Sequence, residues 1–264
     1  MQPALPPIKI TVLGSGTSVG VPTIGCHCKV CTSTDPRDSR LRPSIMVQYS
    51  GRNIVVDTTP DFRQQVLRAR IDRLDAVLYT HSHADHILGL DDLRPFNFMQ
   101  REPVPIYLTE ETLAVIQRCF SYVFQAGPTE SSRPKIDVRT FVSEPINLFG
   151  VVFQPVRLNH GRGTTHGFRF GRCAYLTDHS DIPAESLAFL NDLDVLFLDA
   201  LRHKPHPTHT TLERAVEWVE QLKPRRAFLT HMSHDLGHAR TEELLPPHIR
   251  LAYDGLEIEM EGGG

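Results

Sequence analysis

The hexapeptide HSHADH at residues 81–86 places four potential metal ligands within six residues. It follows an apolar run typical of a strand and precedes a run typical of the start of a helix. In an extended chain His81 and His83 point to the same side, and the turn into a helix directs Asp85 and His86 elsewhere. The spacing therefore predicts two adjacent metal positions, each supplied by one pair of ligands.

A site for two metals needs more than these four ligands. Strand ends can converge at one edge of a sheet, so we looked for His and Asp directly after later apolar runs. The sequence offers His160 after residues 151–158, Asp178 after residues 173–177 and His231 after residues 227–230.

In this order, the motifs resemble the metallo-β-lactamase fold superfamily, whose signature is H-x-H-x-D-H. The resemblance covers residues 13–254 and implies an α+β fold, the αββα four-layer sandwich, with metals at one edge. It also implies which ligands serve which metal: His81, His83 and His160 hold one, Asp85, His86 and His231 hold the other, and Asp178 bridges both.

Two further aspartates end apolar strand-like runs. Asp57 matches the first Asp motif of the superfamily, which implies that it hydrogen-bonds to the metal-bound histidines and orients them. For Asp199 two roles remain: it orients metal-bound histidines in the same way, or it is an ordinary turn residue at the end of a strand. Neither is expected to bind metal directly.

Cys26, Cys28 and Cys31 form a C-x-C-x-x-C cluster. Three thiolates this close can hold one soft metal and leave a fourth position open. The chain has five cysteines, an odd number, which favours metal ligation in a reducing, cytoplasmic compartment over a disulfide framework. Free reduced thiols remain an alternative, and His27 is one candidate for the fourth ligand.

With the glycine-containing segment at residues 13–22, this cluster narrows the resemblance to PhnP-like (phosphoribosyl 1,2-cyclic phosphate) phosphodiesterases, with PqqB proteins more distant. The resemblance implies that His234 completes a Cys₃His structural zinc site. It also implies that His209, just before a predicted helix, binds substrate or donates a proton. The glycines of residues 13–22 do not follow the G-x-G-x-x-G pattern, which excludes a dinucleotide loop.

The elements that must position these residues are many short strands interrupted by few helices, which predicts sheets flanked by helices. Residues 1–264 are expected to form a single domain with loose ends at 1–7 and 262–264. Cys119 and Cys173 are predicted to lie in the core. The predicted strands are 8–13, 44–48, 53–57, 76–80, 106–108, 151–156, 167–170, 173–177, 195–199, 227–230 and 249–252, and the predicted helices are 61–69, 110–124, 184–190, 211–221 and 241–245.

The composition is that of a globular protein, with 40% hydrophobic and 22% charged residues in a chain of 264. The net charge is only −3, so we expect neither an extended nucleic-acid surface nor a membrane surface. No apolar run approaches the roughly 20 residues that span a bilayer. The first seven residues match neither a signal peptide nor a transit peptide.

The ligand set together with the family resemblance implies a binuclear metal-dependent phosphodiesterase acting on a small, cyclic phosphate ester. A hydroxide bridging two ions of Mn, Zn or Fe would attack phosphorus. Asp85 and His209 are the expected catalytic residues, with His209 supplying a proton to the leaving oxygen. A homodimer is compatible with the resemblance. The alternatives are a PqqB-like cofactor-biosynthesis protein and a nuclease like the tRNA 3′-processing endonucleases; a thioesterase of the glyoxalase II kind fits the Cys cluster less well.

Overall fold

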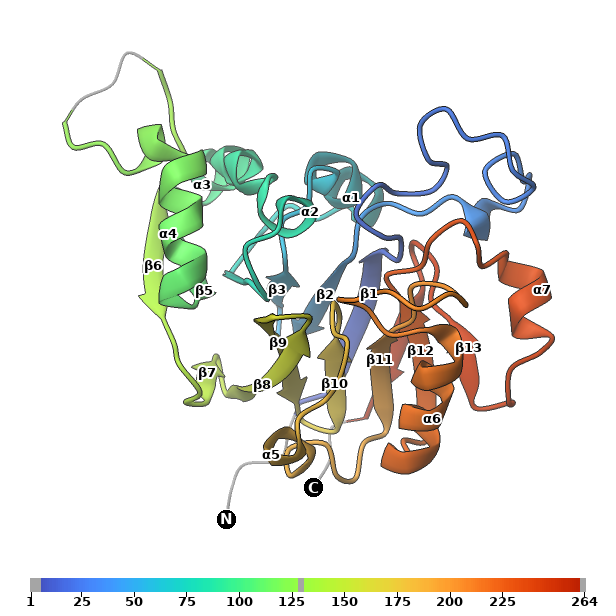
Figure 1. The fold of residues 1–264 in the computed structure, drawn as a ribbon. Coiled ribbons are helices and arrows are strands. Elements are labelled where there is room, and N and C mark those ends of the chain that lie inside the picture. Colours follow the sequence, from blue (N-terminus) through green and yellow to red (C-terminus); the bar gives the residue numbers. More distant parts are fainter. Residues whose placement is uncertain (1–5, 128–130, 262–264) are drawn as a thin grey trace.

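The computed structural model describes residues 6–127 and 131–261. Within these residues the strands form two seven-stranded sheets (Figure 1). The predicted loose ends fall outside the described residues except for Pro6 and Pro7. The first sheet has the order β14-β1-β2-β3-β4-β5-β6, with β1 at Ile8–Gly14, β2 at Ser44–Tyr49, β3 at Arg52–Val56, β4 at Ala76–Leu78, β5 at Val104–Leu108, β6 at Ile136–Thr140 and β14 at Glu257–Met260.

The second sheet repeats this plan with strands from the second half of the chain. In each sheet, antiparallel strands join a run of parallel ones, which are β3 to β6 in the first sheet and β10 to β13 in the second. The order is β13-β12-β11-β10-β9-β8-β7, with β7 at Ile146–Leu148, β8 at Val151–His160, β9 at Gly163–Phe170, β10 at Cys173–Leu176, β11 at Val195–Asp199, β12 at Arg226–Thr230 and β13 at Ile249–Leu251.

Helices connect the strands and cover the outer faces of both sheets (Figure 1). The α-helices are α1 at Phe62–Ala69, α2 at Ala84–Ile87, α3 at Arg94–Gln100, α4 at Glu110–Cys119, α5 at Ala184–Leu187, α6 at Leu212–Leu222 and α7 at His238–Glu242. Short 3₁₀ turns are η1 at Pro36–Asp38, η2 at Leu90–Leu93 and η3 at Ser121–Val123.

The apolar side chains pack in three layers. Val47 of the first sheet and Phe153 of the second belong to the layer between the sheets. Phe62 of α1 packs with strands on the outer face of the first sheet. Ala215 and Val219 of α6 do the same on the second. The structure therefore confirms the αββα sandwich and its α+β class.

Helix α6 shows how local sequence produces one of these layers. Leu212, Ala215 and Val219 recur at helical spacing and are buried, so one stripe of the helix faces the sheet. The Thr211 hydroxyl accepts a hydrogen bond from the backbone N–H of Arg214 and caps the first turn. Lys223, in the left-handed conformation, ends the helix. The observed bounds agree with the predicted helix to within a residue.

Other predicted elements differ from the structure. The helix predicted at 241–245 begins three residues earlier, as α7, and the helix predicted at 110–124 ends at Cys119 and continues as η3. Cys119 is exposed rather than in the core, whereas Cys173 is buried. Within the described residues, no helix is both long and apolar enough to cross a membrane.

The parallel strands bring the carboxyl ends of distant segments to one edge of the sandwich. In the first sheet, Val56 pairs with Leu78, so the residues after β3 and β4 are neighbours. In the second, Asp199 pairs with Thr230 at the ends of β11 and β12. The two sheets are joined at this edge by a hydrogen bond from the His166 N–H to the Thr80 carbonyl. Potential ligands far apart in sequence therefore meet here.

Candidate metal centre

The HSHADH motif lies at the carboxyl end of β4. Its first part is extended, and His83 (φ −66°, ψ 153°) is the residue immediately before α2. Asp85 and His86 belong to α2 and are buried. The change from extended chain to helix gives the His81–His83 pair and the Asp85–His86 pair different directions.

His81 and His83 meet ligands from the second sheet. Among the described residues, ligand atoms of His81, His83, His160 and Asp178 lie within 4.8 Å of one another, and we call these residues the first cluster. The ring centroids of His81 and His83 are 4.5 Å apart, and those of His81 and His160 are 5.3 Å apart. Because His160 ends β8, the first cluster draws on both sheets.

A second cluster lies beside the first. In the described part of the chain, ligand atoms of Asp85, His86, Asp178 and His231 are also within 4.8 Å of one another. Asp178 Oδ2 is 3.3 Å from His86 Nε2, and Asp178 Oδ1 is 3.3 Å from His231 Nε2. Asp178 Oδ2 also lies 3.7 Å from His81 Nε2. The Asp178 carboxylate is therefore shared by the first and second clusters.

The donor atoms of these clusters fit bound cations. Buried atoms with no hydrogen-bond partner in residues 6–127 and 131–261 include His81 Nε2, His86 Nε2, His231 Nε2 and both ring nitrogens of His160. Buried polar groups are normally paired, because leaving one without a partner costs free energy. Neutral imidazoles and carboxylates are also ligands that Zn, Mn and Fe accept. The unpaired nitrogens thus point to metal ions as their missing partners.

Asp57 contacts His86 of the second cluster on the side of the ring away from the other ligands. Its Oδ2 accepts a hydrogen bond from His86 Nδ1 at 2.7 Å, which leaves Nε2 of that ring directed at the cluster. The backbone N–H and hydroxyl of Thr80 donate to the two carboxylate oxygens of Asp57 at 2.9 and 2.8 Å. Burial raises the pKa of Asp57, while His86 opposes this effect. The sequence did not single out Thr80, although it lies directly before the motif.

Asp199 connects two histidines at the same edge. Its Oδ2 is 2.9 Å from His209 Nδ1, and its Oδ1 lies 3.8 Å from His231 Nδ1. The His209 ring stacks on His231 with centroids 4.5 Å apart, and its centroid is 5.0 Å from that of His160. His209 therefore packs beside residues of both clusters. Asp199 contacts His209 directly, so it is more than a turn residue at the end of a strand.

The buried carboxylates make this edge attractive to cations. Burial by itself disfavours a charged imidazole, yet Asp178, Asp85 and Asp199 outweigh it and raise the pKa of His231 to about 9. Metal binding requires the neutral ring, so a cation entering the second cluster would displace a proton. The same carboxylates that hold the proton would then hold the cation.

His179 is a site residue that the sequence did not identify. His179 is buried, and neither ring nitrogen has a hydrogen-bond partner among the residues described. Its backbone N–H donates to Asp199 Oδ2 at 3.0 Å, and its carbonyl accepts from the Thr210 hydroxyl. Its position directly after Asp178 was the available signal.

The cysteine cluster meets His234, as the family resemblance implies. His234 Nδ1 lies 3.2 Å from Cys26 Sγ, 3.5 Å from Cys28 Sγ and 3.3 Å from Cys31 Sγ. A tetrahedral zinc with ordinary bond lengths would separate a sulfur and a nitrogen ligand by about 3.6 Å, close to these values. His27 is exposed and lies outside this group. The donor set therefore fits a closed Cys₃His site.

Hydrogen bonds attach the same loop to the segment that carries His231 and His234. Arg40 is 1% exposed and donates to the carbonyls of Ser233 at 3.0 Å and Leu236 at 2.6 Å. The carbonyl of Met232 accepts from the N–H of Thr17. Figure 1 shows the loop after β1 extending toward α7. These contacts fix the backbone that directly follows His231.

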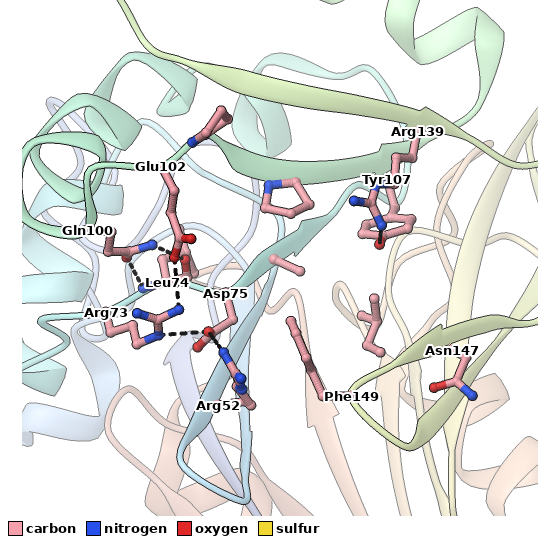
Figure 2. A pocket seen from close by; sticks show the side chains of 14 residues that line it. Arg52, Arg73, Leu74, Asp75, Gln100, Glu102, Tyr107, Arg139, Asn147 and Phe149 are labelled. Atoms are coloured by element: carbon pink, nitrogen blue, oxygen red, sulfur yellow. Dashed lines mark hydrogen bonds and ion pairs between the residues drawn. The ribbon is translucent and has the colours of Figure 1, made fainter.

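A separate pocket of about 380 Å³ lies at the opposite edge, beside the amino ends of β4 and β5 (Figure 2). Arg52 and Arg73 each contact Asp75 at 2.8 Å, and Arg73 also contacts Glu102 at 2.9 Å. In Figure 2 these charged side chains point toward one another, and the Arg52 guanidinium lies over the Phe149 ring, 4.4 Å from its centroid. They already neutralise each other, so we assign no chemistry to this pocket.

Comparisons with known proteins agree with this geometry. Residues 52–232 match the family model described as the Beta-lactamase superfamily domain. A solved structure described as a new diphosphatase from the PhnP family is 52% identical, covers 98% of this chain and 99% of its own, and superposes with a TM-score of 0.93. The chain belongs to the PhnP family of the β-lactamase superfamily. PhnP-family membership and the clusters together make it a metal-dependent hydrolase.

Curated relatives carry other names. An octanoyltransferase from Porphyromonas gingivalis (strain ATCC BAA-308 / W83) is 40% identical over 260 residues, which are 97% of this chain and 52% of that protein. A coenzyme PQQ synthesis protein B from Methylorubrum extorquens (strain PA1) is 33% identical over 41% of this chain and 40% of its own. This PhnP-family chain thus spans about half the length of the first relative and matches less than half of the second.

More distant structures share the fold. Zn²⁺-bound PqqB from Methylobacterium extorquens is 19% identical, with a TM-score of 0.77 over 96% of this chain and 100% of its own. The short form of human tRNase Z is 20% identical, with a TM-score of 0.69 over 95% of this chain and 98% of its own. At these identities they support the PhnP-family fold and do not distinguish among activities.

Proposed function

We propose that the protein is a binuclear metal-dependent phosphodiesterase that hydrolyses a small phosphate ester. The observation that carries this proposal is the buried Asp178 carboxylate, whose oxygens lie 3.3 Å from His86 Nε2 and from His231 Nε2 and which both clusters share. A carboxylate shared by two adjacent ligand sets can hold two ions close together, the arrangement that two-metal hydrolases use. Family membership gives the hydrolytic class, and the clusters supply the residues.

The residues assigned to the ions follow the clusters. His81, His83 and His160 would hold one ion, Asp85, His86 and His231 the other, with Asp178 between them. When bound, two divalent ions lower the pKa of a coordinated water and neutralise charge on the phosphate oxygens. Mn, Zn and Fe all accept this His and Asp donor set.

His209 is proposed to bind the substrate or to donate a proton to the leaving oxygen. Asp199 Oδ2 holds His209 Nδ1 at 2.9 Å, so Nε2 is the ring nitrogen left to face a ligand. The His209 side chain is 12% exposed, which leaves it accessible from the edge of the site.

A third ion is proposed as a structural zinc held by Cys26, Cys28, Cys31 and His234. Its ligands come from the loop after β1 and from the turn after β12. With no open position, such a site stabilises the fold without performing chemistry. It would hold the turn only three residues from His231, so it supports the centre indirectly.

Two substrate classes compete for this proposal. The family resemblance points to cyclic ribose phosphates, whereas the 52% identical structure is described as a diphosphatase. We would measure hydrolysis of both classes, of aryl phosphodiesters, of an acyl thioester and of precursor tRNA, with Mn or Zn supplied. Hydrolysis of a phosphate ester that is lost with Asp178→Ala supports the proposal. Turnover of only the thioester or the tRNA would overturn it.

A further inference from the structure

A groove opens beside the metal centre on the side of His81. It has a volume of about 690 Å³, and Thr80, His81 and Ser82 form one of its walls. The start of α4, the residues after β6, the β8–β9 pair, and α5 with the residues that follow it form the others. This volume is within the range of small-molecule sites. His81 belongs both to the groove and to the first cluster, so the groove adjoins the first cluster at this residue.

Aromatic side chains form part of the lining of the groove. Phe141 and His166 pack edge to face, with ring centroids 5.5 Å apart and an interplanar angle of 89°. Phe189 also lines the groove, and it is 39% exposed although it is a large apolar side chain. Flat apolar faces of this kind favour a planar ring over a flexible chain.

The charges of the lining disfavour a second anionic group. Glu110, Glu111 and Glu185 face the groove with Arg157, which itself lies 3.3 Å from the Glu185 carboxylate. Burial, together with Arg157, lowers the pKa of His166 to about 4, so this ring is neutral at pH 7. Carboxylates and a neutral imidazole can accept hydrogen bonds from N–H and O–H groups.

We propose that this groove binds the nucleoside part of the substrate, base and ribose, while the phosphate lies at the metal centre. A nucleoside is uncharged, carries a planar ring and presents N–H and O–H donors, which are the properties that these walls select. This inference rests on the proposed phosphodiesterase function and assigns its substrate class, a nucleotide ester. Phe189 is the side chain proposed to contact the base.

The first test compares two synthetic diesters with the same leaving group. Thymidine 5′-(4-nitrophenyl phosphate) carries a nucleoside, and methyl 4-nitrophenyl phosphate does not. We expect the metal-loaded protein to prefer the thymidine ester in kcat/KM by at least about 10-fold. The Phe189→Ala variant should lose most of this preference, since losing one stacking partner weakens base binding by about 10-fold or more.

Phe149→Ala is the matched control. Phe149 is also an exposed phenylalanine, at 47%, but it lies in the pocket at the opposite edge (Figure 2). This variant should keep the wild-type preference for the thymidine ester. An equal fall in the preference for both variants, or no preference in the wild type, would overturn the assignment of the groove.

A second test does not depend on catalysis. Binding of thymidine itself, followed by NMR titration, should weaken at least about 5-fold in Phe189→Ala and stay unchanged in Phe149→Ala. If diesters are hydrolysed but Phe189→Ala has no effect in either test, the proposed phosphodiesterase function is supported and the assignment of the groove to the nucleoside is refuted. Thymidine binding that depends on Phe189, without hydrolysis of any diester, would support the groove and refute the phosphodiesterase. Thermal unfolding of both variants verifies that they fold.

Discussion

At the scale of single residues, the metal centre contains unusual backbone conformations. Asp57, Asp178 and His231 have φ values of 66°, 53° and 58°, in the left-handed region that non-glycine residues rarely adopt. Each such residue costs on the order of 1–3 kcal/mol and persists only where its surroundings hold it. All of them place side chains at the clusters, so the strain coincides with the positions that need a fixed side-chain direction.

Asp178→Ala should lower phosphodiester hydrolysis by at least about 10²-fold, the effect of misplacing reacting groups. The reason is that its carboxylate is the group common to the first and second clusters. Steady-state rates with saturating metal measure the loss, and circular dichroism verifies the fold. Asp181→Ala is the control, because Asp181 is a nearby aspartate that is exposed and outside both clusters. Retention of more than a tenth of the wild-type kcat would remove Asp178 from the site.

His209→Ala should reduce kcat for alkyl esters by about 10²–10⁴-fold and spare aryl esters, because only a basic leaving oxygen needs a proton. Comparing the two ester types in one variant distinguishes a proton donor from a residue that binds phosphate. His203→Ala is the control, since His203 lies in the same segment but its side chain is 51% exposed and contacts Glu213. Equal losses on both esters would assign His209 to binding instead.

At the scale of elements, the sequence predicted best where short apolar runs end in His or Asp. Strands β3, β4, β10, β11 and β12 were found in this way, with their terminal polar residues. Strands β6, β7 and β14 were missed. At least half of the side chains in β6 and β14 are exposed or half-buried, which weakens the apolar signal, and β7 has only two buried residues. Helix α3 was missed because seven residues containing a proline show little periodicity.

Contacts between distant elements were beyond the sequence. Arg40 donates to Ser233 and Leu236, about two hundred residues away, and nothing in its local pattern distinguishes it from a surface arginine. The pairing of the cysteine loop with His234 was available only through the family resemblance. His179 and the Asp199–His209 contact depend on the packing of loops at the carboxyl edge, which a linear pattern does not specify.

Cys28→Ser should lower the melting temperature more than it lowers kcat per folded molecule. A closed Cys₃His zinc ties the loop after β1 to the turn after β12, so its loss removes folding free energy. Calorimetry and active-site-normalised rates measure the two effects separately. Cys119→Ser is the control, since Cys119 is exposed and outside the cluster. An unchanged melting temperature with lost activity would make the cluster catalytic.

At the scale of the whole molecule, the first half of the chain forms one sheet together with β14 from the C-terminal end, and the second half forms the other. Both sheets contribute ligands to one edge. The first sheet provides the HSHADH motif, and the second provides His160, Asp178 and His231. Neither half holds a complete ligand set, so the metal centre and the packing of the sandwich depend on each other. Metal binding is therefore expected to stabilise the docking of the sheets.

This arrangement predicts metal sites of two kinds in one chain. We expect the His and Asp clusters at the carboxyl edge to exchange their ions, whereas a Cys₃His zinc is closed and tight. Protein expressed with sufficient metal should contain more than two metals per chain by elemental analysis. Brief treatment with a chelator should abolish hydrolysis while about one zinc per chain remains, and added Mn or Zn should restore activity.

A single metal per chain, with no gain on reconstitution, would contradict the binuclear centre. Loss of all metal in one step, together with unfolding, would instead show that the two kinds of site are not independent.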